Sequence, residues 1–146
     1  MISSLLSDFR SKKKSAQDIT EEHLARIAEK DPEIGAFLYI NAENARKKAK
    51  ERDSSGDFSA PLAGIPMTLK DIIAVEGLQN TAGSKILEGY ISPYSSTVWK
   101  KLEAAGAILL GKVNTDEFTM GSSCENSAYK ITKNLLQIFC NYLFWR

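Results

Sequence analysis

The sequence predicts an α/β fold, in which helices cover the faces of a central sheet. Segments whose apolar residues recur at helical spacing alternate with short apolar runs that are typical of strands. One such run, residues 107–114 (AILLGKVN), is apolar almost throughout, which is typical of a strand buried on both faces. The chain has 146 residues, 43% hydrophobic and 25% charged, so it is long enough for one globular domain with a core.

The first predicted helix begins at Ser15, because Asp18 three residues later completes the pattern of a capping box. We expect Pro32 to end this helix at Asp31, since the residue before a proline disfavours the helical conformation. The short apolar run 34–40 (IGAFLYI) is then predicted to be a buried strand. The residues expected on the buried face of the helix are Ile19, Leu24, Ile27 and Ala28.

A surface helix, a loop and a second strand are predicted next. Residues 41–53 are polar on most sides and rich in helix formers, whereas residues 54–61 have the Ser, Gly and Pro content of a loop. In residues 61–71 (PLAGIPMTLKD), apolar side chains alternate with others at a period of two. This alternation predicts a short strand that ends at Lys70.

The last elements precede and follow the apolar strand. Residues 95–107 are predicted to form a helix with Val98, Leu102 and Ala105 on its apolar face and Gly106 as its cap. Residues 115–120 (TDEFTM) are predicted to form a short helical turn, with acids at the end where the helix dipole favours them.

The composition excludes some classes of function. The net charge is +1, from 19 basic and 18 acidic residues, so bulk charge indicates neither a nucleic-acid partner nor a membrane surface. Cys124 and Cys140 are too few for a disulfide framework and lack the spacing of metal ligands. We therefore expect no metal and a cytoplasmic, reducing setting, and the N-terminal residues do not resemble a signal peptide.

Lys70 is either a strand-end lysine that faces solvent or an amine delivered into a site. Residue type alone favours the first interpretation. The second has a mechanism: a lysine among apolar groups loses its proton more readily, and a neutral amine is a general base toward a serine.

The other candidate residues are weaker. Gly121–Ser123 is predicted to be a turn, the single histidine His23 a surface residue, and Lys12–Lys14 a solvated basic face.

Three segments, in this order, resemble the N-terminal part of the amidase signature family. They are residues 61–71 (PLAGIPMTLKD), 81–87 (TAGSKIL) and 104–129 (AAGAILLGKVNTDEFTMGSSCENSAY). Within the family, the third segment is most similar to the A subunit of glutamyl-tRNA(Gln)/aspartyl-tRNA(Asn) amidotransferase. The resemblance runs from residue 1 to residue 134. It implies part of a mixed central sheet covered by helices, and hence an incomplete fold.

The resemblance also implies a chemistry. Lys70 matches the base of a Ser–Ser–Lys triad, which deprotonates a bridging serine that activates a nucleophilic serine. The nucleophile attacks the side-chain amide of glutamine, forms an acyl-enzyme and releases ammonia. Met120 and Gly121 match the segment that lines the glutamine pocket, whereas Ser122 and Ser123 match positions near that pocket and not the triad serines.

The implied partners are the B and C subunits of the amidotransferase. Ammonia would travel to the B subunit, where ATP and magnesium serve the amidation of glutamate or aspartate on misacylated tRNA. This chain would itself need no cofactor and would meet tRNA only indirectly. The alternatives left open are a stand-alone amidase of the same family and a non-catalytic remnant or binding module that docks on those subunits.

Residues 135–146 (LLQIFCNYLFWR) depart from the family pattern. The family continues with a Gly-Gly-Ser-Ser-Gly-Gly loop that carries the bridging serine, but here Leu135 follows Asn134 and an apolar stretch without helical or strand period begins. We interpret residues 135–146 as an unrelated, out-of-frame tail after a domain of residues 1–134. A base without its nucleophile performs no covalent catalysis, so we expect this chain to be inactive alone and to have an open sheet edge.

Overall fold

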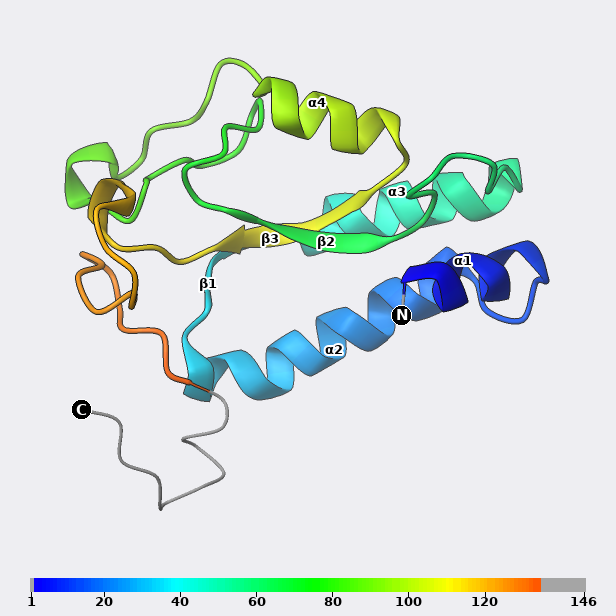
Figure 1. Ribbon diagram of the computed structural model, residues 1–146, viewed down its shortest axis with the longest axis horizontal. Coiled ribbons are helices and arrows are strands. Elements are labelled where there is room, and N and C mark those ends of the chain that lie inside the picture. Colours follow the sequence, from blue (N-terminus) through cyan, green and yellow to red (C-terminus); the bar gives the residue numbers. More distant parts are fainter. Residues whose placement is uncertain (1, 135–146) are drawn as a thin grey trace.

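The computed structural model describes residues 2–134, so the prediction of a separate tail at 135–146 lies outside the described residues. Within this range the fold is α/β, as predicted, with a mixed three-stranded sheet in the order β1-β3-β2. The central strand β3 (Ile108–Val113) is parallel to β2 (Pro66–Lys70) and antiparallel to β1 (Phe37–Ile40). Figure 1 shows β2 and β3 side by side, with their carboxyl ends pointing the same way.

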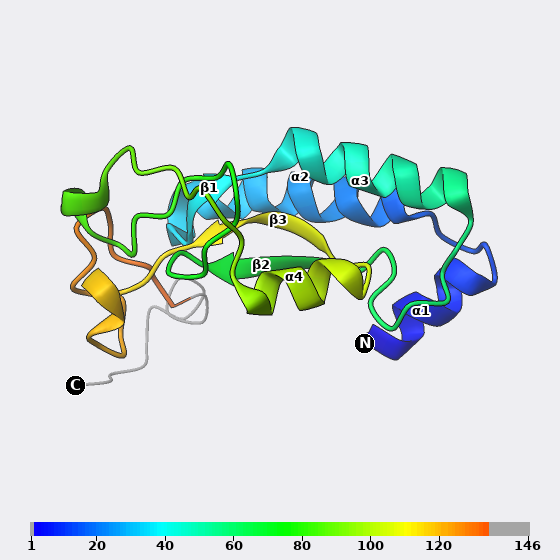
Figure 2. The same cartoon turned by 90° about the horizontal axis from the view of Figure 1, so that it is seen from above.

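Helices lie on both faces of the sheet. Helices α2 (Ala16–Ile34) and α3 (Ala42–Ser55) cover one face together with α1 (Ile2–Arg10), and α4 (Thr97–Ala104) covers the other (Figure 2). The core is correspondingly divided into two clusters. The cluster beside α2 and α3 comprises Phe9, Ala16, Ile19, Leu24, Ala45, Ala49, Ile65, Ile108 and Leu110, and the cluster beside α4 comprises Leu69, Val75, Trp99 and Leu109.

Helix α2 begins as predicted and ends later than predicted. The hydroxyl of Ser15 accepts a hydrogen bond from the backbone N–H of Asp18, whose carboxylate accepts one from the backbone N–H of Ser15. Pro32 lies inside the last turn, where its missing N–H removes only one helical bond. The helix ends instead at Gly35, whose φ of 70° is the left-handed conformation typical of a helix C-terminus.

The buried face of α2 is narrower than predicted. Ile19 and Leu24 are buried and Ile27 packs against them, but Ala28 is exposed. Because α2 extends through Ile34, the first strand is shortened to Phe37–Ile40. It is an edge strand that is half-buried rather than buried.

A carboxylate joins the ends of α2 and α3. The backbone N–H groups of Ala16 and Gln17 donate to the side chain of Asp53 at 2.7 and 3.0 Å. The last turn of α3 therefore satisfies two of the free donors at the first turn of α2. The prediction of a surface helix over residues 41–53 is confirmed, with only Ala45 and Ala49 buried.

Helix α4 buries a different residue from those predicted. Ser96 caps the helix by accepting a hydrogen bond from the backbone N–H of Trp99, and Trp99 is buried whereas Val98 is 54% exposed. The prediction treated the apolar residues as one stripe and missed the larger aromatic side chain beside it. The helical turn predicted at residues 115–120 is present only in part, as the 3-10 helix η2 (Glu117–Thr119), within which Phe118 has a non-helical backbone. A second 3-10 helix, η1 (Lys85–Leu87), lies earlier in the chain.

Candidate active site

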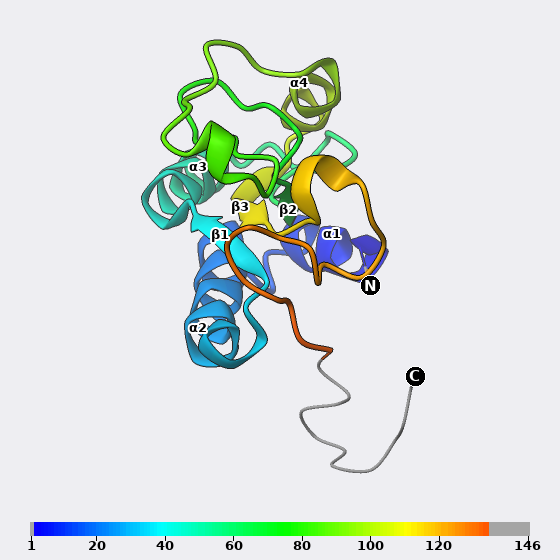
Figure 3. The same ribbon diagram turned by 90° about the vertical axis from the view of Figure 1, so that its left-hand side faces the viewer.

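The candidate site lies at the carboxyl ends of the parallel strands β2 and β3. The connections that follow these strands, residues 71–96 and 114–134, gather at this end of the sheet (Figure 3). In open α/β sheets the carboxyl end of parallel strands is where ligands bind. The candidate site residues are therefore the side chains at and just after the carboxyl ends of β2 and β3.

Lys70 is the last residue of β2 and is exposed. Among residues 2–134, its ammonium group has no hydrogen-bond or ion-pair partner, so this range of the chain leaves it open to solvent. Met120 and Gly121 are also exposed and follow η2 at the same end of the sheet, with Met120 78% exposed. Their predicted catalytic and pocket-lining roles stay predictions.

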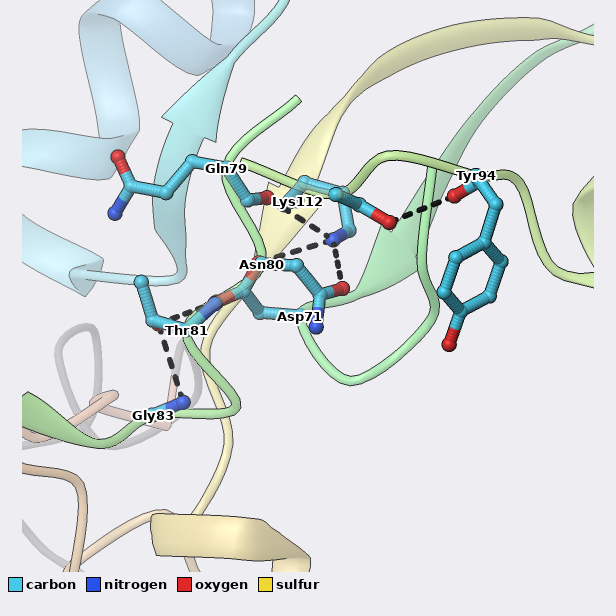
Figure 4. Close-up of polar contacts among 8 residues, drawn as sticks. Asp71, Gln79, Asn80, Thr81, Gly83, Tyr94 and Lys112 are labelled. Atoms are coloured by element: carbon cyan, nitrogen blue, oxygen red, sulfur yellow. Dashed lines mark hydrogen bonds and ion pairs between the residues drawn. The ribbon is translucent and has the colours of Figure 1, made fainter. Parts of the chain in front are cut away.

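A different lysine is buried beside this end of the sheet. Lys112 of β3 is fully buried, and its Nζ donates to Asp71 Oδ1 at 3.0 Å, Asn80 Oδ1 at 3.1 Å and the carbonyl oxygen of Gln79 at 3.4 Å (Figure 4). Three acceptors match the three N–H bonds of an ammonium group. Desolvation lowers the pKa of Lys112, and the charge of the Asp71 carboxylate opposes that change.

Asp71 connects three segments of the chain. Its second carboxylate oxygen accepts hydrogen bonds from the backbone N–H of Thr81, at 2.8 Å, and from the Thr81 hydroxyl. Its own backbone N–H donates to the carbonyl oxygen of Val113 at 2.9 Å. The hydroxyl of Thr81 in turn accepts from the N–H of Gly83 (Figure 4). These bonds hold the end of β2, the end of β3 and the loop 79–83 together.

A β-bulge directs Lys112 toward Asp71. In the β2–β3 register, Met67 is opposite Leu109 but Thr68 is opposite Gly111, so Leu110 is the extra residue. One extra residue reverses the alternation of side chains along the rest of the strand. Lys112 therefore lies opposite Leu69, on the sheet face of α4, instead of on the face that regular alternation from Leu109 would give.

Sequence reasoning missed this buried network. The available signal was a lysine within residues 107–114, a strand predicted to be buried on both faces. A buried charge requires a partner of opposite charge. The sequence therefore indicated that Lys112 has an acidic partner, but not that this partner is Asp71. Asn80 and Thr81 lie in a loop and carried no such signal.

A second carboxylate shapes the segment of Met120 and Gly121. Asp116 is buried and accepts hydrogen bonds from the backbone N–H groups of Asn126 at 2.9 Å, Cys124 at 3.1 Å and Ser123 at 3.2 Å. The bond from Asn126 contributes most to holding the pKa of Asp116 below its usual 3.8, and desolvation opposes it. These bonds hold the segment around Gly121, where a Cβ atom would overlap the Asp116 carboxylate.

The backbone before Met120 is in a sparsely populated conformation. Phe118 and Thr119 have φ values of 51° and 61°, in the left-handed region that non-glycine residues rarely adopt. Backbone hydrogen bonds hold them there. The N–H of Phe118 donates to the carbonyl oxygen of Ala82 at 2.8 Å, and the N–H of Thr119 donates to the backbone carbonyl oxygen of Asp116 at 2.7 Å. The Ser84 hydroxyl also donates to the Glu117 carboxylate at 2.5 Å. Strained backbone of this kind is often concentrated at functional sites.

Cavity size does not identify the site. A cleft of about 880 Å³ lies at the opposite end of the sheet from Lys70, between Lys12–Lys14 and residues 53–59.

Two of the weaker candidates lie in or just before helix α2. Lys12–Lys14 are exposed, and His23 is half-buried on α2, with its Nδ1 atom 2.7 Å from the carbonyl oxygen of Ile19. Within residues 2–134 there is no group of three or more His, Cys, Asp or Glu side chains that could hold a metal ion. No helix in the same range is long and apolar enough to cross a membrane.

Comparison of the sequence with protein families matches residues 18–137 to the family described as Amidase. The A subunit of glutamyl-tRNA(Gln) amidotransferase from Clostridium botulinum (strain Alaska E43 / Type E3) is 50% identical over 133 residues, which are 88% of this chain and 27% of the relative. The protein of the same name from Acidothermus cellulolyticus is 50% identical over 123 residues, 82% of this chain and 24% of the relative. The chain thus spans about a quarter of the length of these curated relatives.

Solved structures contain the same arrangement of elements. One, described as a vestigial protein complex that reveals the evolutionary origins of an s-triazine catabolic enzyme, superposes with a TM-score of 0.87 at 36% identity, over 92% of this chain and 30% of that one. The 6-aminohexanoate cyclic dimer hydrolase gives 0.80 at 30% identity, over 90% and 26%. The peptide amidase of Stenotrophomonas maltophilia gives 0.72 at 34% identity, over 78% and 24%.

Proposed function

The chain belongs to the amidase family, and from this premise we propose that it is the N-terminal part of a glutamine-hydrolysing subunit of a glutamyl-tRNA(Gln)/aspartyl-tRNA(Asn) amidotransferase. The observation that carries the proposal is the position of Lys70 at the carboxyl end of β2, the end of the sheet at which the parallel strand β3 leads into the segment of Met120 and Gly121. Identity of 50% to the A-subunit relatives, against 30–36% to the three solved structures compared above, favours the amidotransferase.

Lys70 is the base in this proposal. Its amine takes the proton of a bridging serine hydroxyl, and that serine takes the proton of a nucleophilic serine, whose oxygen attacks the amide carbon of glutamine. The C–N bond then breaks, and the proton returns through the bridging serine to the departing ammonia. Met120 and Gly121 border the glutamine pocket. In the family, both serines lie in the segment that follows the part matched by residues 1–134.

The proposal includes partners. Ammonia released at the Lys70 site passes to the B subunit, which uses ATP and magnesium, and the C subunit completes the complex. The chain itself requires no cofactor and contacts tRNA only through the complex, in the cytoplasm. The names of the curated relatives support membership in a tRNA-dependent amidotransferase.

A chimera tests the proposal. Residues 1–134 of this chain replace the matching N-terminal segment of the Clostridium botulinum relative, and release of ammonia from glutamine is measured in the presence of the B and C subunits. We expect glutaminase activity in the chimera, none in the 146-residue chain alone, and a loss of about 100-fold or more in Lys70→Met, because one acid–base group contributes roughly that factor. Lys100→Met, an exposed lysine on α4, is the matched control and should keep full activity. An active Lys70→Met chimera would exclude Lys70 as the base.

A second candidate function is a stand-alone amidase, which the similarity to the peptide amidase and to the cyclic dimer hydrolase supports. Co-purification distinguishes the two. A chain of the amidotransferase is retained by the B and C subunits, whereas a stand-alone amidase is not. Retention of the 146-residue chain by those subunits, without activity in the chimera, would instead favour a non-catalytic binding module.

A further inference from the structure

The buried ion pair of Lys112 and Asp71 takes no part in the proton transfers proposed above. Both side chains are almost completely shielded from solvent, with 0% and 2% of their surfaces exposed. Burying two charges is costly, and an apolar pair of similar size is often equally stable or more stable. Added stability is therefore a weak explanation for the pair, and its geometry requires a separate one.

The pair acts at the residue that follows Lys70. Asp71 is held through both carboxylate oxygens, by Lys112 on one side and Thr81 on the other, and through its backbone N–H by Val113. These contacts come from β3 and from the loop after β2. They fix the peptide group that joins Asp71 to Lys70, and with it the point at which the Lys70 side chain leaves the sheet.

Each N–H bond of the Lys112 ammonium group has its own acceptor. The ammonium group has three acceptors, and the two that Gln79 and Asn80 supply come from one loop. Loss of Lys112 would leave the Asp71 carboxylate buried without its counter-charge and release this loop. The effect would thus begin next to Lys70 and not in the α2–α3 core, which forms a different cluster on the other face of the sheet.

We infer that the Lys112–Asp71 ion pair is a positioning device for Lys70, with Lys112 as a positioning residue of the proposed reaction. The β-bulge at Leu110 turns Lys112 to the face where it reaches Asp71, and Asp71 fixes the carboxyl end of β2. The catalytic meaning of the device rests on the proposed function. The geometric statement concerns this chain alone and is testable without activity.

Amide hydrogen exchange followed by NMR on the full 146-residue chain tests the inference. In Lys112→Met, we expect the amides of Asp71 and Thr81 to exchange about tenfold faster or more, and the side-chain signals of Lys70 to shift, because the opening is local. The amides of Ala45 and Ala49 in α3 should stay within about twofold of the wild type. Equal acceleration at all four amides would show a purely stabilising role, and no change at Asp71 would also overturn the inference.

Two further variants keep the test decisive. If Lys112→Met does not fold, Asp71→Asn removes the charge at constant size, and the same local pattern is expected. Lys130→Met is the matched control, because Lys130 pairs with Asp31 at 3.7 Å near the other edge of the sheet and should not affect Asp71.

The chimera gives a kinetic test of the same inference. There, Lys112→Met should lower kcat, while KM and the folded fraction of the protein stay unchanged. An inactive parent chimera would contradict the proposed function and leave the exchange result to decide this inference.

Discussion

Asp116 organises the segment of Met120 and Gly121 with one carboxylate. Its oxygens accept hydrogen bonds from three backbone N–H groups, and Gly121 lies against it with no room for a side chain. A carboxylate with several backbone donors is favoured in its charged form, which accounts for the lowered pKa. The role of a single residue here is to fix the path of a loop that has no regular secondary structure.

This arrangement predicts how stability depends on pH. The folded pKa of Asp116 is below its usual 3.8, so its contribution is fully present above that value and is lost as the pH falls through the folded pKa. The difference in unfolding free energy between the wild type and Asp116→Asn should thus be constant above about pH 5 and should shrink below pH 3.8. Urea denaturation at a series of pH values measures it. Glu76→Gln, an exposed carboxylate, is the control, and a difference that is equal at low and neutral pH would refute the prediction.

At the scale of elements, the corner between α2 and β1 depends on Asp31. Its carboxylate accepts hydrogen bonds from the backbone N–H groups of Ala36 at 2.6 Å and Phe37 at 3.1 Å, and Lys130 lies 3.7 Å away. A carboxylate at a helix C-terminus is unfavourable by itself. The two donors and the ammonium group offset that cost, and they join the end of the helix to the first strand.

Asp31→Ala should therefore destabilise the chain by about 1–3 kcal/mol, because it leaves two partly buried N–H groups without an acceptor. Glu33→Ala, an exposed acid on the last turn of α2, should change stability by no more than about 0.5 kcal/mol. Urea denaturation of both variants, with exchange of the Phe37 amide as a local probe, checks the comparison. Equal effects of the two substitutions would mean that the side-chain bonds of Asp31 do not hold the corner.

The elements also show which features the sequence could predict. Apolar periodicity and capping residues located β3, β2 and α2, because these signals depend on near neighbours. The predicted end of α2 was wrong because Pro32 costs little in a last turn that Gly35 and Asp31 terminate. The half-buried state of β1 followed from its place at the sheet edge, which only the tertiary arrangement decides.

The candidate site could be predicted only in part. Lys70 was located at the end of a strand from its position alone, and its family role came from the resemblance. The partnership of Lys112 and Asp71 depends on a β-bulge and joins residues 41 positions apart. A single extra residue in one strand reverses the direction of the side chains that follow, and no local sequence pattern predicts where such a β-bulge occurs. Long-range register is thus the physical limit of the sequence argument.

At the scale of the whole molecule, β2 forms one edge of the sheet, and within residues 2–134 no strand pairs with its outer side. Open edges favour pairing between copies, and a lysine on the edge opposes it. Exposed Thr68 lies in β2, so Thr68→Lys should weaken self-association by about tenfold, because paired edges would bring like charges together.

Sedimentation velocity over a range of concentrations measures this change. Thr97→Lys adds the same charge at an exposed position of α4, away from the edge, and should leave self-association unchanged. A wild-type chain that stays monomeric at all concentrations would contradict the premise that the edge of β2 is exposed to other copies.

The contact of Asp53 with the first turn of α2 has a consequence for the order of events during synthesis. All the groups of this contact lie within residues 15–55, whereas β1 has no partner until residues 108–113 of β3 are made. Contacts that are short in sequence form early, and chains fold from the N-terminus as they emerge from the ribosome. We therefore expect the contact between α2 and α3 to form before the sheet, and β3 then to complete the core that these helices share with Ile108 and Leu110.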